Sequence, residues 1–267
     1  ELMFQMNKVF KKFKKFKISS NFFILEKSDL LKKIQKKKLS SHKITWINSI
    51  SEIKTGPNIF LANEFFDASP IKQFVKKKNK WFEKKIKKQN GKLQIIDSIT
   101  NINKLEKKIG INLSKNQNFI EFSPLTFKFL NVLSKKINSF HGGLLIIDYG
   151  YFEKKMRDSL QSVHKHSFNS IFDNLGKSDI TYCLNFFLIK KIAEKLNLNV
   201  AGLTDQKKFL INLGILHRAE IITNNLKFSE KADIYYRLKR LIDKDLMGGL
   251  FKVMFLTTKK NKFKVGF

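Results

Sequence analysis

The first third of the chain alternates lysine-rich segments with short apolar runs. Apolar residues recur at helical spacing over residues 2–13 with lysines between them, which predicts an amphipathic helix packed on a core. Short apolar runs at 22–25, 43–47 and 59–62 predict strands. The basic segment 29–38, between the first two runs, predicts a second helix. Strands that alternate with helices indicate an α/β fold with a parallel sheet and right-handed crossovers.

The pattern changes after Pro70. Short strand-like runs, separated by lysines, asparagines and the turn signal Asn90-Gly91, predict an antiparallel insertion. These runs are residues 74–75, 81–86 and 93–96. We expect the inserted subdomain to span about 71–123 and to include a short helix near 101–109.

The rest of the chain returns to longer helices and buried strands. Ser123 and Pro124 predict the N-cap and first position of a helix over 125–137, and the apolar run 144–147 predicts a buried strand. The other predicted elements are an edge strand within 158–166, a helix capped by Asp179, Ile180 and Thr181 that runs to about residue 196 with Cys183 on its apolar side, a helix beginning at Asp205, further helices to residue 244 and a terminal strand at 250–256.

Polar side chains follow two of the buried runs at the point where each predicted strand ends. They are Asn63, Glu64 and Asp67 after the first run, and Asp148 and Tyr149 after the second. In an open α/β sheet, ligands bind just beyond the carboxyl ends of the strands, so two such ends predict a cleft. The first stretch taken alone also fits a structural interpretation, in which Asn63 or Asp67 caps a turn while Phe65 and Phe66 fill the core.

Two earlier strand ends also carry polar groups. Glu26 directly follows the first predicted strand, where a carboxylate of a nucleotide-binding fold can accept hydrogen bonds from both ribose hydroxyls of a cofactor. Asn48 and Ser49 follow the second predicted strand.

The net charge of +31 is carried almost entirely by lysine. Lys, Asn, Ile and Phe are all frequent and all have A/T-rich codons, so codon bias alone explains such a composition. Proteins that read nucleic acid rely on arginine for bidentate contacts that lysine does not make. We therefore predict a lysine-coated, solvated surface and do not expect a nucleic-acid partner. Hydrophobic residues make up 42% of the chain, which fits a globular fold, and no apolar run is long enough for membrane insertion.

Neither cysteine nor histidine predicts a metal site. The single cysteine, Cys183, excludes an intrachain disulfide and a cysteine-based zinc cluster. His164 and His166 would share one face of a strand, but no acidic or cysteine partner lies near them in the sequence.

Five segments of the chain together resemble one protein family. They occur in the order GPNIFLANEFFDASPIKQF, GGLLIIDYGY, DSLQSVHKH, SDITYCLNF and MGGLFKVMFL. The chain resembles the MidA-like S-adenosylmethionine-dependent methyltransferases, a family that includes mitochondrial complex I assembly factors. The likeness covers essentially the whole chain, and its NEFFDAxP and GGxxxxDYGY blocks are specific.

This resemblance implies a Rossmann-like class I methyltransferase sheet with an inserted antiparallel β/helical subdomain, all within one domain over 1–267. In this family a glycine-rich loop ends the first strand, and Glu1 would align just after that loop. We therefore expect the first strand and its loop to be missing at the amino end, together with any targeting signal. A fragment of this kind is expected to fold poorly and to bind cofactor weakly, whereas the intact parent should fold well and bind cofactor tightly.

The resemblance also implies S-adenosylmethionine as cofactor and gives the candidate residues their roles. By this likeness Glu26 binds the ribose, Asn48 and Ser49 lie near the adenine, Asn63 and Glu64 lie nearest the transferred methyl, Asp148 and Tyr149 flank the substrate side, and Asp179 and Thr181 belong to a segment over the cleft.

The implied reaction is arginine N-methylation of a protein substrate resembling a respiratory complex I subunit. A guanidinium is a poor nucleophile, and the paired carboxylates Glu64 and Asp67 are the natural device to hold and polarise it. Two alternatives stay open: an RNA-modifying methyltransferase, and a non-catalytic assembly factor on the same fold. The expected compartment is the cytoplasm for a bacterial source and otherwise the mitochondrial matrix.

Overall fold

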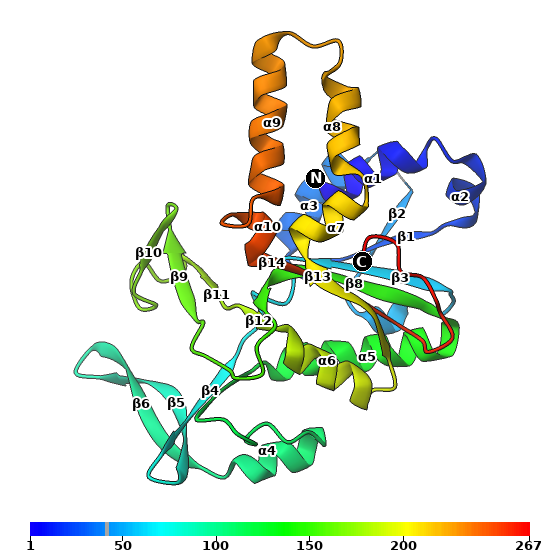
Figure 1. The fold of residues 1–267 in the computed structure, drawn as a ribbon. Coiled ribbons are helices and arrows are strands. Elements are labelled where there is room, and N and C mark those ends of the chain that lie inside the picture. Colours follow the sequence, from blue (N-terminus) through cyan, green and yellow to red (C-terminus); the bar gives the residue numbers. More distant parts are fainter. Residues whose placement is uncertain (41–42) are drawn as a thin grey trace. The chain divides into compact units, whose positions relative to one another are not determined.

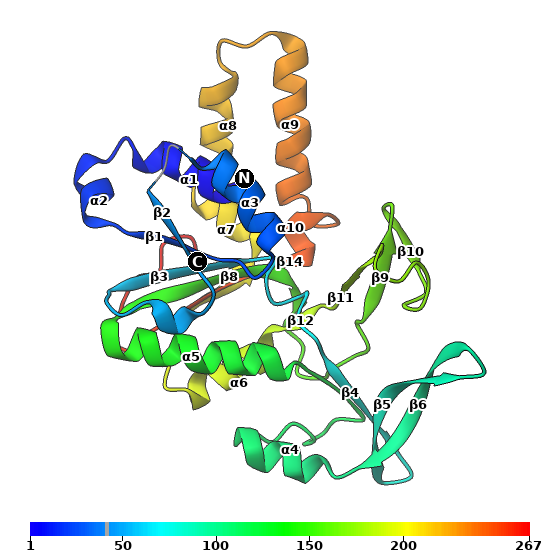
Figure 2. The same ribbon diagram turned by 180° about the vertical axis from the view of Figure 1, so that it is seen from behind.

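The computed structural model describes residues 1–40 and 43–267, and Figures 1 and 2 show the chain from opposite sides. The chain divides into two compact units, Glu1–Thr55 and Gly56–Phe267. Both units combine helices with strands, which confirms the predicted α/β class. The assignment of residues 1–267 to a single methyltransferase domain stays a prediction.

The first unit contains a parallel pair of strands. Its elements are α1 (Leu2–Phe10), α2 (Lys14–Ser19), β1 (Phe22–Leu25), α3 (Asp29–Lys38), β2 (Ile44–Ile47) and a 3-10 turn, η1 (Ile50–Glu52). Leu25 of β1 pairs with Ile47 of β2, so the carboxyl ends of both strands meet at one edge. The two strands and the helix between them form the predicted βαβ arrangement.

The prediction of a single helix that reaches Phe13 is wrong. α1 ends at Phe10, and α2 begins at Lys14 after a short turn. This turn brings the ring of Phe16 to 4.8 Å from that of Phe10, while Phe22 lies 5.5 Å from Phe10. The bend therefore allows the three rings to pack against one another, and these aromatic contacts stabilise it.

The second unit is built on a mixed sheet with β8 (Gly142–Tyr151) at its centre. β3 (Asn58–Asn63) pairs with β8 in parallel, and β14 (Phe251–Thr257) pairs with it in the antiparallel sense. β13 (Asn199–Asp205) lies outside β14, and β12 (Leu184–Asn185) pairs with the last two residues of β8. Helices cover both faces of the sheet, so β8 and β14 read as nearly continuous apolar runs.

In both views α5 (Pro124–Phe140) and α6 (Phe186–Lys195) lie on one face of this sheet and α7 (Gln206–Asn212) on the other (Figures 1 and 2). α5 begins as predicted, because the Ser123 hydroxyl accepts the Thr126 N–H with Pro124 in the first position. The carboxylate of Asp205 caps α7 in the same way. The remaining helices are α8 (Ile215–Thr223), α9 (Phe228–Ile242) and α10 (Met247–Leu250).

An antiparallel sheet follows the main sheet's first strand, within the range predicted for the insertion. Its strands are β4 (Lys72–Lys77), β5 (Lys80–Gln89), β6 (Lys92–Thr100) and β7 (Phe119–Phe122), with α4 (Ile102–Ile109) before β7. The spatial order is β6-β5-β4-β7. Asn90 and Gly91 form the predicted turn between β5 and β6, which are longer than the short runs in the sequence indicated.

A three-stranded sheet corrects three further predictions. β9 (Gln161–His164) lies between β10 (Ser167–Asn169) and β11 (Asp179–Thr181), so it is a central strand and not an edge strand. Asp179, Ile180 and Thr181 form β11 and do not cap a helix. Asn185 caps α6 by accepting the Leu188 N–H at 2.9 Å, so Cys183 precedes this helix and is not on its apolar side. Because aspartate, threonine and asparagine all serve as N-caps, the local pattern fitted both starting points.

Among the described residues, no helix is long and apolar enough to cross a bilayer.

The close approach of β3 and β8 can be tested by substitution of Gly142. Its φ of +106° and an ideal Cβ only 1.9 Å from the Asn58 carbonyl oxygen leave no room for a side chain, whereas Gly176 has φ +76° but open space. We expect Gly142→Ala to lower the melting temperature by roughly 10 °C and Gly176→Ala by only roughly 2–4 °C, from backbone strain alone. Thermal unfolding followed by circular dichroism measures both, and equal shifts would contradict the packing described here.

Candidate active site

The parallel pairing of β3 and β8 brings two sets of predicted site residues to one edge of the sheet. Asn63 pairs with Ile147, so the residues after β3 leave the sheet beside Asp148 and Tyr149. The prediction that the second strand ends at Ile147 is wrong, because β8 continues through Asp148 and Tyr149, which pair with Lys252 and Phe251 of β14. The Glu64 N–H donates to the Ile147 carbonyl oxygen at 3.0 Å, and Glu64 itself has φ +47°. This left-handed conformation turns the chain sharply out of the strand. We call residues 63–67 the site loop.

Asp148 fixes the backbone of the site loop. Its side chain is fully buried, and Oδ2 accepts the N–H groups of Phe65 at 3.3 Å and Phe66 at 3.0 Å. Oδ1 accepts the N–H of Tyr149 at 3.0 Å. A buried carboxylate with three such donors is well satisfied. The geometry supports a positioning role for Asp148, in which its carboxylate holds the loop instead of touching a substrate.

Asp67 is a second buried carboxylate at the same place. It is 6% exposed, and among the described residues its Oδ1 has no hydrogen-bond partner. Burial raises the pKa of Asp67, and the nearby Glu64 carboxylate raises it further. Burial, followed by the charge of Asp67, raises the pKa of Asp148 to about 7. Two neighbouring buried carboxylates cannot both ionise cheaply, so the pair retains a proton near neutral pH.

The other residues of the site loop divide between core and rim. Phe66 is fully buried, and the ring of Phe65 lies 5.1 Å from those of both Phe66 and Phe129. Phe66 therefore fills the core as the structural interpretation predicted, whereas Phe65 is half-buried. Asn63 and Glu64 are exposed, and the Asn63 amide donates to Glu64 Oε1 at 3.3 Å. Their polar groups are accessible to a ligand.

Tyr149 stands beside these carboxylates. Its ring centroid lies 4.1 Å from that of Phe251, which fixes the side chain against the end of β14. Burial raises the pKa of Tyr149, and the charges of Glu64 and Asp67 add to this, while Arg240 of α9 lowers it. The net direction is upward, so the hydroxyl is protonated at neutral pH and available as a hydrogen-bond donor.

β11 reaches the site loop through the residue after its last position. The N–H of Tyr182 donates to the Asp67 carbonyl oxygen at 3.2 Å, which places Thr181 next to the loop. The Thr181 hydroxyl accepts from the Gln161 amide at 3.3 Å. Asp179 is exposed, and in the described part of the chain its carboxylate forms no hydrogen bond or ion pair. Of the two predicted residues, Thr181 directly precedes the residue that binds the site loop, whereas Asp179 lies two residues further back.

The first unit carries the three remaining candidates at the shared edge of β1 and β2. Glu26 is half-buried, and its oxygens accept from the Ser28 N–H at 2.9 Å and the Gln35 amide at 2.8 Å. Asn48 Oδ1 accepts from Lys32 Nζ at 2.5 Å. Ser49 caps η1 by accepting the Ser51 N–H at 3.2 Å. Each carboxylate oxygen of Glu26 can accept a further hydrogen bond, whereas the Ser49 hydroxyl already caps η1.

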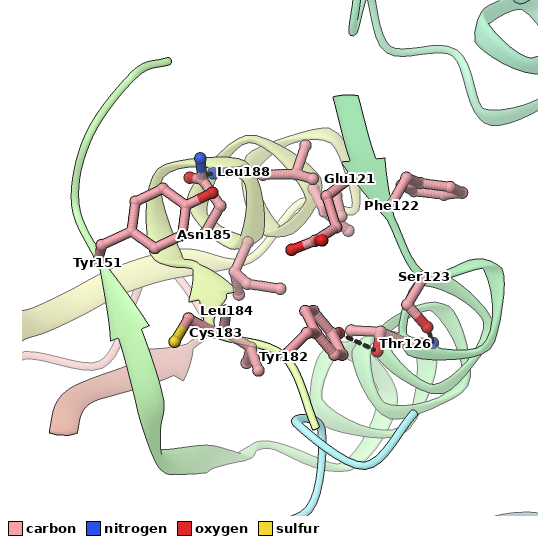
Figure 3. Close-up of a pocket in the computed structure, with 12 residues that line it drawn as sticks. Glu121, Phe122, Ser123, Thr126, Tyr151, Tyr182, Cys183, Leu184, Asn185 and Leu188 are labelled. Carbon is pink, nitrogen blue, oxygen red and sulfur yellow. Dashed lines mark hydrogen bonds between the residues drawn. The ribbon is translucent and has the colours of Figure 1, made fainter. Parts of the chain in front are cut away.

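A small pocket of about 20 Å³ lies between β7, β8 and α6 and was not predicted from the sequence. Figure 3 shows the residues that line it. The pocket has room for about one water and none for a cofactor. Glu121 and Tyr182 line it, and the Tyr182 hydroxyl lies 3.4 Å from that of Thr126. Burial raises the pKa of Glu121. The one sequence signal was this carboxylate inside the apolar run Phe-Ile-Glu-Phe.

Among the described residues, no cluster of three His, Cys, Asp or Glu side chains has the arrangement of a metal site. His164 Nδ1 lies 3.1 Å from the Lys177 carbonyl oxygen, and His166 belongs to the turn after β9.

The fold is that of known crystal structures. A protein from Burkholderia thailandensis matches with a TM-score of 0.77 at 20% identity, covering 92% of this chain and 68% of that one. A second structure from the same organism, with S-adenosyl-homocysteine bound, matches with a TM-score of 0.73 at 20% identity, covering 89% and 64%. At this identity the likeness establishes the class I-like methyltransferase fold alone.

Residues 1–204 match the profile of a family described as "Putative S-adenosyl-L-methionine-dependent methyltransferase". The chain belongs to this family, which confirms the resemblance seen in the sequence.

Curated relatives extend the comparison. The zebrafish (Danio rerio) protein named "Protein arginine methyltransferase NDUFAF7, mitochondrial" is 27% identical over 212 residues, 78% of this chain and 49% of that protein. Its Xenopus tropicalis counterpart is 27% identical over 223 residues, and the human one 24% over 182. The chain spans about half the length of the curated relatives it matches.

Asp148 predicts a specific pH dependence of stability. Its folded-state pKa of about 7 lies above the ordinary value of 3.8, so the stability it contributes is complete below about pH 4 and is lost as the pH rises through about 7. We expect the unfolding free energy of the wild type, relative to Asp148→Asn, to fall by up to about 4 kcal/mol between these limits. Urea unfolding at a series of pH values measures this difference, and parallel pH profiles of the two proteins would contradict it.

Proposed function

We propose that this protein is an S-adenosylmethionine-dependent methyltransferase that methylates arginine in a protein substrate. The observation that carries the proposal is the buried, unpartnered Oδ1 of Asp67 on the same loop as the exposed carboxylate of Glu64. The family, the bound S-adenosyl-homocysteine of one structural neighbour and the names of the curated relatives support it.

The residues present suit this cofactor. Glu26 offers two carboxylate oxygens with remaining acceptor capacity at the end of β1, which is what two ribose hydroxyls require. Asn48 and Ser49 follow the neighbouring strand at the same edge, on the side assigned to the adenine. When bound, the cofactor supplies an electrophilic methyl group on a sulfonium. Asn63 and Glu64 are assigned to the region nearest that methyl.

Arginine suits the two acidic groups of the site loop. A guanidinium presents five N–H donors and remains charged at all physiological pH values. Glu64 presents an exposed carboxylate, and the buried Asp67 Oδ1 has an unused acceptor position that a guanidinium reaches if the site loop opens around it, so the two could then hold a planar fork and polarise it. A proton on Asp148 would allow Asp67 to stay anionic beside it. The main contribution of these residues is alignment of the nucleophile.

The proposed partner is a protein that resembles a respiratory complex I subunit, with Tyr149, Asp179 and Thr181 on the substrate side. The curated relatives are named as mitochondrial proteins, so we place the reaction in the mitochondrial matrix; for a bacterial source it belongs in the cytoplasm.

Cofactor binding is tested through Glu26. Loss of a charged hydrogen-bond acceptor costs roughly 1.5–3 kcal/mol, so we expect Glu26→Ala to weaken the binding of S-adenosyl-homocysteine about 10- to 100-fold in the full-length protein. Isothermal calorimetry measures this affinity. Asp29→Ala removes an exposed carboxylate of the same unit and should leave the affinity unchanged. No binding by the wild type, or equal affinities for all three proteins, would overturn the cofactor assignment.

Methyl transfer is tested through the site loop. We expect Asp67→Asn and Glu64→Gln each to lower the rate at which tritiated methyl reaches arginine-containing peptides by about 100-fold or more, since each removes a charge that aligns the nucleophile. The affinity for S-adenosyl-homocysteine should change less than about threefold, because neither carboxylate is assigned to its ribose.

Glu220→Gln, which changes an exposed carboxylate on α8, provides the matched control. Full activity of the Asp67 and Glu64 variants, or a methylated product other than arginine, would refute the proposed chemistry.

A further inference from the structure

The outer strand of the inserted sheet has an open edge. β6 pairs with β5 on one side, and no strand of the described chain pairs with its other side. Natural proteins usually protect long edge strands with charges, prolines or bulges. β6 is nine residues long, contains no proline, and carries one lysine and one aspartate; its register with β5 has no bulge. Such an edge is suited to accepting another strand.

The turn fixes which backbone groups face this edge. Asn90 and Gly91 both have positive φ, at +49° and +78°, so a two-residue turn closes the hairpin and Gln89 and Lys92 form a hydrogen-bonded pair. From this pair onward, non-hydrogen-bonded and hydrogen-bonded pairs alternate along the hairpin. The residues that direct their N–H and C=O groups away from β5 are therefore Leu93, Ile95, Asp97 and Ile99.

The same residues display an apolar stripe on one face of the hairpin. Ile95 and Ile99 are 42% and 67% exposed, and Ile86, directly opposite Ile95 on β5, is 64% exposed. A partner strand with an apolar residue at every second position would continue this stripe.

Lysines surround the stripe. Residues 76–92 contain nine lysines and one glutamate, a net charge of +8. Lys84 and Lys88 alternate with Ile86 along β5, so they share its face. Neither forms an ion pair within the described residues, whereas Lys77 is paired with Asp97. The charge that faces an incoming strand is therefore positive and largely unneutralised.

Three kinds of occupant fit these observations poorly. A second copy of the hairpin would bring the same positive charge. Single-stranded nucleic acid is bound by stacking on aromatic rings and by arginine, whereas the exposed apolar groups here are isoleucines and the hairpin has no arginine. For a membrane surface, the tip formed by Gln89, Asn90, Gly91 and Lys92 is wholly polar.

We propose that the open edge of β6 binds an extended, acidic segment of a protein substrate as an additional strand. Main-chain hydrogen bonds to Ile95 and its neighbours provide affinity, and acidic side chains beside Lys84 and Lys88 provide selectivity. That the bound segment belongs to a substrate rests on the proposed methyltransferase function, whereas the strand-binding site itself does not.

The inserted sheet is connected to the candidate active site by hydrogen bonds. β4 follows the site loop along the chain, and its Gln73 amide donates to Glu121 Oε2 at 2.7 Å. The Ser159 N–H donates to the same oxygen at 3.3 Å, and the Ser159 hydroxyl accepts the Cys183 N–H at 2.9 Å. The adjacent Tyr182 holds the site loop. These bonds involve β4 and β7, which lie at the other side of the sheet from β6, so a segment docked on β6 would be held by the same subdomain that is joined to the site loop.

Fluorescence anisotropy with a labelled peptide of alternating glutamate and valine tests the proposal, with an alternating lysine and valine peptide as control. The titration is done on the full-length protein without cofactor, so the result does not depend on methyl transfer. We expect saturable binding of the glutamate peptide and at least about tenfold weaker binding of the lysine peptide.

Two kinds of variant separate the backbone contribution from the charge. Ile95→Pro removes an outward N–H and leaves the hydrogen bonds to β5 intact, so it should weaken binding about tenfold or more; Ile95→Ala should have a smaller effect, about two- to threefold. Lys84→Glu combined with Lys88→Glu should weaken binding about tenfold or more. The same double change at Lys260 and Lys262 is the charge-matched control and should have little effect.

Retained binding in both the proline variant and the Lys84/Lys88 double variant would overturn the proposal, as would equal binding of the two peptides. If the proline variant fails to fold by circular dichroism, the lysine variants still decide. Tighter binding of a single-stranded RNA, or of phosphatidylserine-containing vesicles, that is lost with Lys84 and Lys88 would reassign the surface to that partner.

Discussion

A buried carboxylate within the central strand, beside the point where β3 ends, holds the loop on which the candidate active site depends. Asp148 accepts hydrogen bonds from the backbone of Phe65 and Phe66, and Glu64 can then adopt its left-handed conformation at the end of β3. Without these bonds, two backbone N–H groups would have to find other partners in a place with little water. The same burial raises the pKa of Asp148, which links the shape of the loop to the charge of Asp67.

This arrangement gives the two carboxylates of the pair different roles, and only one of them is proposed to meet a ligand. Asp148 has its oxygens occupied by the backbone, whereas Asp67 Oδ1 has no partner among the described residues. A proton shared within the pair lowers the cost of keeping one charge in a buried place. Tyr182, which donates to the Asp67 carbonyl, connects the loop to the segment that also contacts Ser159 and Glu121. The loop is thus supported from β8 and from the segment after β11.

The sequence predicted those parts that depend on local pattern. Buried strands read as apolar runs, and polar residues at their ends marked the edge where the site loop and Asp148 meet, because parallel strands align their carboxyl ends. It did not show that Asp148 points inward, since the same residue type serves equally well as a ligand or as a backbone acceptor. Asp179 was misassigned for a related reason: an Asp-x-Thr pattern suits a helix cap as well as a strand, and pairing with β9 decided the outcome. The open edge of β6 also required the strand order, which no local pattern contains.

The central claim is that the site loop faces the reacting group of the cofactor. A crystal structure of the full-length protein with S-adenosyl-homocysteine bound tests it most directly. The account predicts that the sulfur lies against Asn63 and Glu64, the two exposed residues of the site loop. A cofactor whose sulfur lies away from the site loop would contradict it.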